Sequence, residues 1–265
     1  MEIIELQNLD DERIKVFSSL TDHQLKGEGK EFGLFIAESP KVIRVAFEEG
    51  FQGVSLLCEP RHIKGDAADI IANHPELTVF TGSREILSSL TGYKLTRGVL
   101  CAMKRPPLPS ATEICKSYKK VAVVESVCDT TNIGSIFRSA VALGIDAILL
   151  TPDSCDPFNR RAIRVSMGAV FKIPWTFHPD PVSLLNDYGF TTIALALHED
   201  AVPLSSPELK NKERIAMVLG TEGDGITHKI ISKCRYKAII PMHHNVDSLN
   251  VGAAAAIAFW ELLKP

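Results

Sequence analysis

The last quarter of the chain carries its most distinctive stretch, Ile239-Ile-Pro-Met-His-His-Asn-Val-Asp-Ser-Leu-Asn-Val-Gly-Ala-Ala-Ala-Ala-Ile-Ala258, and before it comes Gly220-Thr-Glu-Gly-Asp-Gly225. The shorter segment places three glycines and two carboxylates directly after the apolar run Ile215–Leu219. Glycines allow a backbone to pass close to a ligand. Neither segment has the composition of a plain core. Both are therefore candidate ligand turns, with a glycine-rich capping loop and a simple helix cap at Asp247 or Ser248 as the alternatives.

The region after residue 118 contains apolar runs without the alternation of a half-exposed strand. Such runs predict strands covered on both faces, as in a parallel sheet. Helical spacing of apolar residues follows the first of these runs and returns at the end of the chain. The expected fold class is therefore α/β, with strands at Val121–Val127, Ala147–Leu150, Thr192–Leu197, Ile215–Leu219 and Ala238–Pro241.

A proline-rich stretch, Lys104-Arg-Pro-Pro-Leu-Pro-Ser110, predicts an extended linker. Before it, short apolar runs alternate with helical patterns, which indicates a small three-layer α/β domain. A leading helix is expected at Asp10–Leu20. The expected organisation is a first domain with its leading helix at residues 1–105, a linker at 106–117 and a second domain at 118–265.

Composition predicts a soluble, cytoplasmic protein. Hydrophobic residues make up 45% and charged residues 23% of the 265 positions, as in globular chains. The longest apolar runs have strand length, and no secretion signal opens the chain. The six cysteines lack any C-x-x-C spacing and are expected to be reduced, buried thiols. The net charge of −3 leaves nucleic-acid affinity to local basic patches such as Lys116–Lys120 or Arg160–Arg164.

A third motif, Asn132-Ile-Gly-Ser-Ile-Phe-Arg138, opens the first helix of the second domain. Asn132 suits a helix N-cap. Arg138 lies nearly two turns further along an otherwise apolar helix and needs a partner there. A structural salt bridge and a phosphate held by the planar guanidinium are both open.

Other common sites are disfavoured by the same turns. The turn after the first strand of this domain, Glu125–Asn132, has no G-x-G-x-x-G, which argues against a Rossmann dinucleotide site. The Gly220–Gly225 turn lacks the Lys-Ser/Thr of a P-loop. The pair His243 and His244 has no third ligand at a recognisable spacing, so no metal is expected.

Together, in this order and spacing, the motifs resemble the SPOUT superfamily of RNA methyltransferases, specifically its TrmH/SpoU family of ribose 2′-O-methyltransferases. The family pattern is Asn-x-Gly-x-x-x-Arg, then Gly-x-Glu-x-x-Gly, then Ile-Pro-Met with a following Ser-Leu-Asn-Val-Ser. The resemblance covers residues 118–265, and Gly252 replaces the family's second serine. Residues 33–103 resemble the ribosomal-protein-like RNA-binding domain that often precedes it. The matching positions are Asn132, Gly134, Arg138, Gly220, Glu222, Gly225, Ile240, Pro241, Met242, Ser248, Leu249, Asn250 and Val251.

The resemblance implies a deep trefoil knot, S-adenosylmethionine as cofactor, and a homodimer whose partner subunit helps complete each site. Its implied reaction is methyl transfer to a ribose 2′-hydroxyl of tRNA or rRNA, without metal. The implied catalytic residues are Arg138, Asn132, Glu222, Ser248 and Asn250. The implied cofactor contacts are Ala196, Leu197, Gly220, Ile240, Met242 and Leu249.

Several alternatives stay open beside this implied function. Arg138 is the family's residue for activating the 2′-hydroxyl, but arginine is essentially always protonated, so binding the adjacent phosphate is a second role for it. A base methyltransferase of the same superfamily and a non-catalytic RNA-binding module are the other functions. The small-residue face Gly252–Ala256 predicts a dimer through the first and last helices of the second domain.

Overall fold

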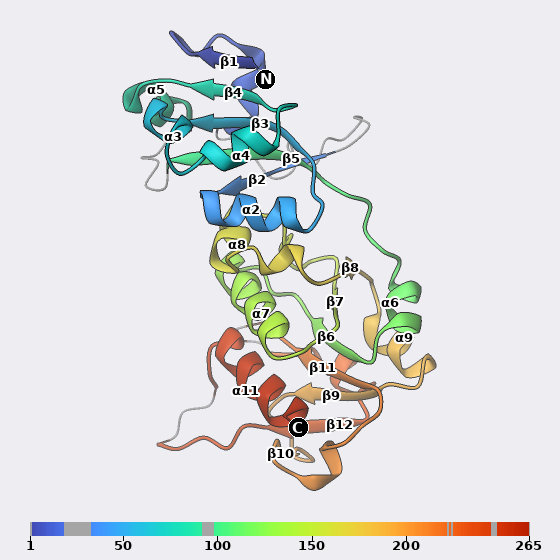
Figure 1. The fold of residues 1–265 in the computed structure, drawn as a ribbon. Coiled ribbons are helices and arrows are strands. Elements are labelled where there is room, and N and C mark those ends of the chain that lie inside the picture. Colours follow the sequence, from blue (N-terminus) through green and yellow to red (C-terminus); the bar gives the residue numbers. More distant parts are fainter. Residues whose placement is uncertain are drawn as a thin grey trace. The chain divides into compact units, whose positions relative to one another are not determined.

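The chain forms two compact units, each built on its own β-sheet (Figure 1). The computed structural model describes residues 2–18, 33–91, 98–221, 223, 225–244 and 248–264. One unit comprises the described residues of Met1–Pro107 together with Phe158–Phe171. The other comprises those of Leu108–Pro157 and Lys172–Pro265. Residues 158–171, expected in the second domain, thus belong to the first unit.

The sheet of the first unit has five strands in the order β1-β4-β3-β5-β2. The strands β1, β4 and β3 are parallel, whereas β5 runs antiparallel to both β3 and β2. The edge strand β1 was not expected, because its sequence Glu-Ile-Ile-Glu is polar and mostly exposed, as charged edge strands are. The strands span β1 Glu2–Glu5, β2 Leu34–Glu38, β3 Gly53–Cys58, β4 Thr78–Thr81 and β5 Val99–Lys104.

Helices cover the sheet of the first unit. On one face, the 3₁₀ helix η1 and helix α5 bury Ile14, Phe17 and Leu87 against Phe80 and its neighbours. Helix α2 packs on β2 and β5. The leading helix is the short η1, and Leu20, where it was expected to end, lies outside the described residues. The helices span η1 Glu12–Phe17, α2 Pro40–Glu48, α3 Pro60–Ile63, α4 Ala68–Asn73, α5 Arg84–Thr91, α8 Arg160–Val165 and η2 Ala169–Phe171.

Aromatic stacking and a buried ion pair explain why Phe158–Phe171 belongs to the first unit. The Phe158 ring stacks on Phe35 with 4.8 Å between centroids. The Arg160 guanidinium lies 3.1 Å from the carboxylate of Glu38, which is buried. Burial lowers the pKa of Arg160, and the Glu38 charge opposes that shift. Arg164 also approaches Glu38, at 3.7 Å, so two of the three arginines in this expected basic patch are engaged in ion pairs.

The second unit contains a seven-stranded sheet in the order β10-β12-β9-β11-β6-β7-β8, and every paired strand is parallel. The expected α/β fold with a parallel sheet is therefore confirmed for this unit. Two strands of two and three residues, β10 and β8, were not expected, because so short a run carries no periodic signal. The strands span β6 Lys120–Val124, β7 Ala147–Leu150, β8 Trp175–Phe177, β9 Thr191–Leu195, β10 Val202–Pro203, β11 Ile215–Leu219 and β12 Tyr236–Ile239.

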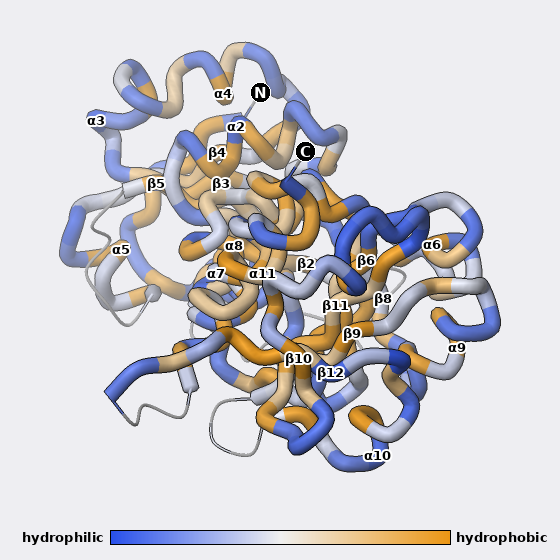
Figure 2. The backbone as a smooth tube through the Cα atoms, turned by 90° about the horizontal axis from the view of Figure 1, so that it is seen from below, coloured by the Kyte–Doolittle hydropathy of each residue, from blue (hydrophilic) through white to orange (hydrophobic). Residues whose placement is uncertain are grey.

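Helices α7 and α11 lie side by side in the second unit (Figure 1). The chain is hydrophobic along β9 and β11 and largely hydrophilic around α10 (Figure 2). Within the expected linker, Ser110 and Glu113 form a reciprocal capping box that starts α6. The helices span α6 Ala111–Ser117, α7 Thr130–Ala142, α9 Pro181–Asp187, η3 Pro207–Leu209, α10 His228–Ile231 and α11 Val251–Leu263.

Candidate functional site

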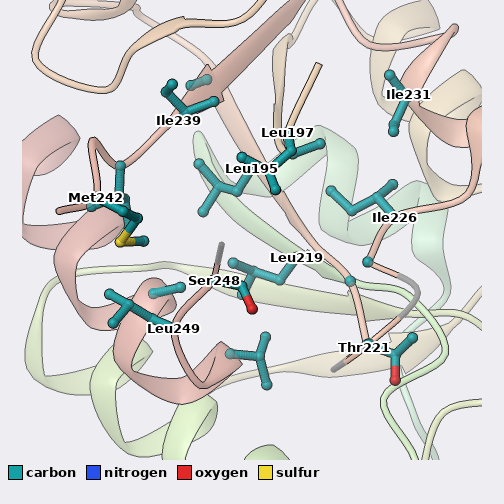
Figure 3. A pocket seen from close by; sticks show the side chains of 18 of the residues that line it. Leu195, Leu197, Leu219, Thr221, Ile226, Ile231, Ile239, Met242, Ser248 and Leu249 are labelled. Carbon is teal, nitrogen blue, oxygen red and sulfur yellow. The ribbon is translucent and has the colours of Figure 1, made fainter. Parts of the chain in front are cut away.

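Three neighbouring parallel strands, β12, β9 and β11, end at one pocket of the second unit (Figure 3). The pocket has a volume of about 330 Å³. Its walls come from the turns that follow these strands and from the start of α11. The carboxyl ends of parallel strands are the usual ligand position in open α/β sheets. The lining residues are Leu195, Ala196, Leu197, Leu219, Gly220, Thr221, Gly223, Gly225, Ile226, His228, Ile231, Ala238, Ile239, Ile240, Met242, Ser248, Leu249, Val251 and Ala254.

All the residues expected to contact a cofactor line this pocket. Two of them follow β9, one follows β11, two follow β12 and one precedes α11. They are Ala196, Leu197, Gly220, Ile240, Met242 and Leu249. The pocket also contains residues that the motifs did not single out, among them Thr221, Ile226 and His228. Their only sequence signal is that they flank the glycines after β11.

The turn after β11 closes on itself through backbone bonds. The Thr221 N–H donates to the Gly225 carbonyl at 3.1 Å, and the Gly225 N–H donates to the Thr221 carbonyl at 3.2 Å. A Cβ on Gly220 would lie 2.3 Å from the Gly225 carbonyl carbon and 2.5 Å from the Ile226 nitrogen. Glycine is therefore required at position 220 because the backbone of Gly225 and Ile226 folds back against it. From the sequence, a closely bound ligand was expected to be the reason for this glycine. Glu222 lies outside the described residues.

Asn132 and Asn250 join the first and last motifs across 118 positions of sequence. The Asn250 amide nitrogen donates to the Asn132 side-chain oxygen at 2.9 Å, and Asn132 is 7% exposed. The Asn250 oxygen accepts from the backbone N–H of Gly252 at 2.9 Å and so caps α11. One side chain therefore starts α11 and ties it to α7.

The caps of both helices differ from those expected. Asp129 caps α7 by accepting the N–H groups of Thr131 and Asn132. Asn132 lies in the first turn of the helix. Its side chain does not cap α7 and instead bonds Asn250 at the start of α11. Ser248, a capping candidate in the sequence, instead lines the pocket, where it is exposed.

Gly252 lies close to α7, against Ser135. A Cβ at this position would lie 2.8 Å from the Cβ of Ser135 and 3.1 Å from the Asn250 side-chain oxygen. Gly252 and Ala255 are buried against the rest of the chain. Part of the small-residue face expected to form a dimer interface thus packs within the subunit, and Ala253, Ile257 and Trp260 remain exposed.

Arg138 projects from the exposed side of α7. Its side chain forms no ion pair or hydrogen bond with the part of the chain that the structure describes, so the salt bridge considered from the sequence is not formed there. Arg138 does not line the pocket, and neither do Asn132 and Asn250. The structure thus groups Ser248 with the pocket, joins Asn132 to Asn250 beside it, and places Arg138 at an exposed position of α7.

The cysteines do not suggest thiol chemistry. All six are free, and Cys58, Cys101, Cys115 and Cys234 are buried as expected. Burial raises the pKa of Cys115 to about 11 and that of Cys234 to about 12, so these thiols stay protonated at neutral pH. Cys128, contrary to the expectation, is exposed.

The described ranges, which leave out residues such as 222, 224 and 245–247, contain neither a metal-binding cluster nor a membrane-spanning helix. No group of three or more His, Cys, Asp and Glu side chains there could hold a metal ion. Helices long and apolar enough to cross a membrane are likewise missing from those ranges.

Comparisons with known proteins agree with the family that the motifs resemble. Residues 119–260 match the sequence model of the SpoU rRNA Methylase family. An uncharacterized tRNA/rRNA methyltransferase of Mycobacterium bovis is 35% identical over an alignment of 264 positions that covers 95% of this chain and 88% of that protein. The 23S rRNA (guanosine(2553)-2'-O)-methyltransferase RlmP of Bacillus subtilis is 29% identical over 182 residues, 68% of this chain and 70% of the relative.

The fold is also that of a solved structure. An AdoMet-bound rRNA methyltransferase from Sinorhizobium meliloti superposes with a TM-score of 0.82 at 23% identity, over 98% of this chain and 97% of the other. The family match spans more than half of the chain, and the mycobacterial relative covers nearly all of it. The chain therefore belongs to the SpoU rRNA methylase family.

Proposed function

We propose that this protein transfers the methyl group of S-adenosylmethionine to a ribose 2′-hydroxyl of tRNA or rRNA. The observation that carries the proposal is the pocket at the ends of β9, β11 and β12. Every residue expected to contact the cofactor lines it. Asn250, which bonds Asn132, lies between the lining residues Leu249 and Val251 at the start of α11. Relatives named for 2′-O-methylation of 23S rRNA support the same reaction.

The residues of the pocket suit this cofactor. Its volume of about 330 Å³ falls in the range of small-molecule sites, which begins near 300 Å³. Apolar side chains such as Leu197, Met242 and Leu249 line the pocket and can pack against the faces of the cofactor's adenine ring (Figure 3). Backbone N–H and C=O groups at the strand ends can hydrogen-bond the edge of that ring. When bound, S-adenosylmethionine supplies an electrophilic methyl group on a sulfonium sulfur.

Arg138, Asn132 and Asn250 form the proposed reaction side of the site. The Asn250 bond holds Asn132 and the first turn of α7, and thereby sets where α7 presents Arg138. A ribose hydroxyl is a poor nucleophile that must lose its proton, to water, as its oxygen replaces the sulfonium sulfur on the methyl carbon, and negative charge develops on the oxygen as that proton leaves. Because an arginine guanidinium cannot act as a base in proteins, we assign Arg138 to binding the neighbouring phosphate and stabilising that charge. Ser248 and Glu222 are proposed, on the family pattern, to position the ribose and Arg138.

A homodimer would complete this site, because Arg138 does not line the pocket of its own subunit. The exposed side of α11 carries Ile257 and Trp260, which are 40% and 60% exposed. Large apolar side chains at this exposure suit a two-fold interface. Light scattering should give about twice the chain mass, and Trp260→Glu should shift the protein toward the monomer. A monomeric wild-type protein would contradict this part of the proposal.

The first unit is proposed to bind the RNA, and the C-terminal chain to form a deep trefoil knot. The separate core of the first unit supports the RNA role, as does its resemblance to ribosomal-protein-like domains. The knot is supported by the insertion of the last strand, β12, between β10 and β9. The cytoplasm is the proposed location.

The RNA role of the first unit is tested on its exposed basic residues. Replacing Lys41, Lys64 and Arg84 by glutamate should weaken RNA binding and leave cofactor affinity unchanged. Unchanged RNA affinity would argue against the RNA role.

Two measurements test the function itself. Calorimetry should show S-adenosylmethionine binding to the purified protein, and incubation with tRNA and rRNA should produce ribose methylation at a mapped nucleotide. Methylation of a base would favour the base methyltransferase alternative. RNA binding without cofactor binding would favour the non-catalytic module and overturn the proposal.

A further inference from the structure

A buried carboxylate just past the end of the neighbouring strand β6 is hydrogen-bonded to the turn that follows β11 and lines the pocket. Glu125 directly follows β6 and is 4% exposed. Its carboxylate accepts two hydrogen bonds from Thr227, one from the backbone N–H at 3.0 Å and one from the hydroxyl at 2.6 Å. A buried carboxylate is costly unless it is hydrogen-bonded, and bonds to an ionised acceptor are stronger than neutral ones. The two hydrogen bonds therefore hold Thr227 against Glu125, because breaking them would leave a buried carboxylate without donors.

Glu125 is bonded to both ends of this turn. Its own N–H donates to the Leu219 carbonyl at 2.9 Å, where β11 ends. Thr227, at the other end, is the N-cap residue of α10. Between the two, Gly220, Thr221 and Ile226 line the pocket, and His228 lines it directly after Thr227. The wall contributed by β11 is thus held in place by a residue that does not itself line the pocket.

The composition of the turn makes this support consequential. The segment between Leu219 and Thr227 contains three glycines, the residue type that loses most backbone freedom on ordering. A turn that is ordered before binding spares the cofactor that entropic cost, which raises affinity without a direct contact. A turn released from Glu125 would have to be ordered by the cofactor itself.

We propose that Glu125 is a positioning residue, which holds Gly220, Thr221 and Gly225–Thr227 in the conformation that binds S-adenosylmethionine. This inference rests on the proposed function. Glu125 acts through Thr227 and does not contact the cofactor. The family motifs do not include either residue, because Glu125 precedes the first motif and Thr227 follows the second.

Three variants of the protein test the inference. Glu125→Gln replaces one accepting oxygen by an NH₂ group, and Thr227→Val removes the hydroxyl while keeping the side-chain shape. Thr227→Ser keeps both bonds and is the matched control. Calorimetry with S-adenosylmethionine should show the Kd raised about 10-fold or more for Glu125→Gln and at least about 3-fold for Thr227→Val, the scale of one bond to a charged group. Thr227→Ser should stay within about 2-fold of wild type.

Kinetics distinguish positioning from a general structural role. The KM for S-adenosylmethionine should rise in Glu125→Gln and Thr227→Val, while kcat at saturating cofactor and the KM for RNA stay within about 2-fold of wild type. Cofactor affinity of Glu125→Gln within about 2-fold of wild type would overturn the inference. If that variant does not fold, the Val and Ser pair decides, and equal affinities of the two would overturn it. Absence of binding to wild type would overturn the proposed function and this inference together.

Discussion

Gly252 is expected to be the position where α11 tolerates no side chain. In Gly252→Ala, the new Cβ would lie 2.8 Å from the Cβ of Ser135, which is closer than real Cβ atoms approach. Both atoms sit on helices, so relief requires α7 and α11 to separate. The same movement would strain the hydrogen bond between Asn250 and Asn132, which spans these two helices.

The size of the effect follows from two opposing terms. Overpacking of a close contact costs about 1–3 kcal/mol. Alanine gains at most about 1 kcal/mol over glycine in a helix, and less near the helix start. The free energy of unfolding should therefore fall by roughly 1–2 kcal/mol, which corresponds to roughly 2–8 °C in melting temperature.

A double-mutant cycle isolates this contact. Ser135→Gly removes the opposing Cβ and should itself cost about 0.5 kcal/mol through helix propensity. Combining it with Gly252→Ala should restore most of the lost stability, with a coupling of about 1 kcal/mol or more. Urea unfolding followed by circular dichroism measures all four proteins. Gly252→Ala at or above wild-type stability, with zero coupling to residue 135, would refute the reasoning. Gly252→Ser, which installs the family's serine, should show the same dependence on Ser135.

The remaining predictions concern the pocket and the reaction side. Gly220→Ala should raise the calorimetric Kd for S-adenosylmethionine more than about 10-fold, because its Cβ collides with the loop's own return. Gly82→Ala, whose Cβ would make only ordinary contacts at 3.5 Å or more, should leave that Kd unchanged. Arg138→Ala should keep cofactor affinity within a few-fold and slow single-turnover methyl transfer about 100-fold or more; Arg138→Lys should be nearly as slow if the planar fork binds phosphate, and near-wild-type turnover in the alanine variant would remove the residue from the mechanism. Asn250→Asp keeps a good helix cap but loses the donor to Asn132, so urea unfolding should show a loss of about 1–3 kcal/mol, and wild-type stability would mean that this bond contributes little.

Most of the second unit could be predicted from local pattern. The bounds of β7 and β11 agree with the expected Ala147–Leu150 and Ile215–Leu219, because a strand buried on both faces is an uninterrupted apolar run. Five of the six expected cofactor residues meet at one pocket because they follow neighbouring strands, and parallel strands bring such turns to one edge, whereas Leu249 is the residue before the N-cap of α11. The pattern fails for β1, whose two glutamates suit an edge strand yet carry no apolar signal.

Only the tertiary structure determined which hydrogen-bond, ion-pair or packing partner each polar or small residue contacts. Asn132 has the composition of a cap, but Asp129 takes that role and frees the Asn132 oxygen for Asn250. Arg160 looks like part of an exposed basic patch, and only the packing of α8 in the first unit buries it against Glu38. Glu125 has no sequence signal, since a carboxylate after an apolar run is equally suited to a solvated turn. Local sequence encodes which residues are buried through periodicity and propensity, whereas the pairing of groups up to 122 positions apart depends on how the completed sheet and helices pack.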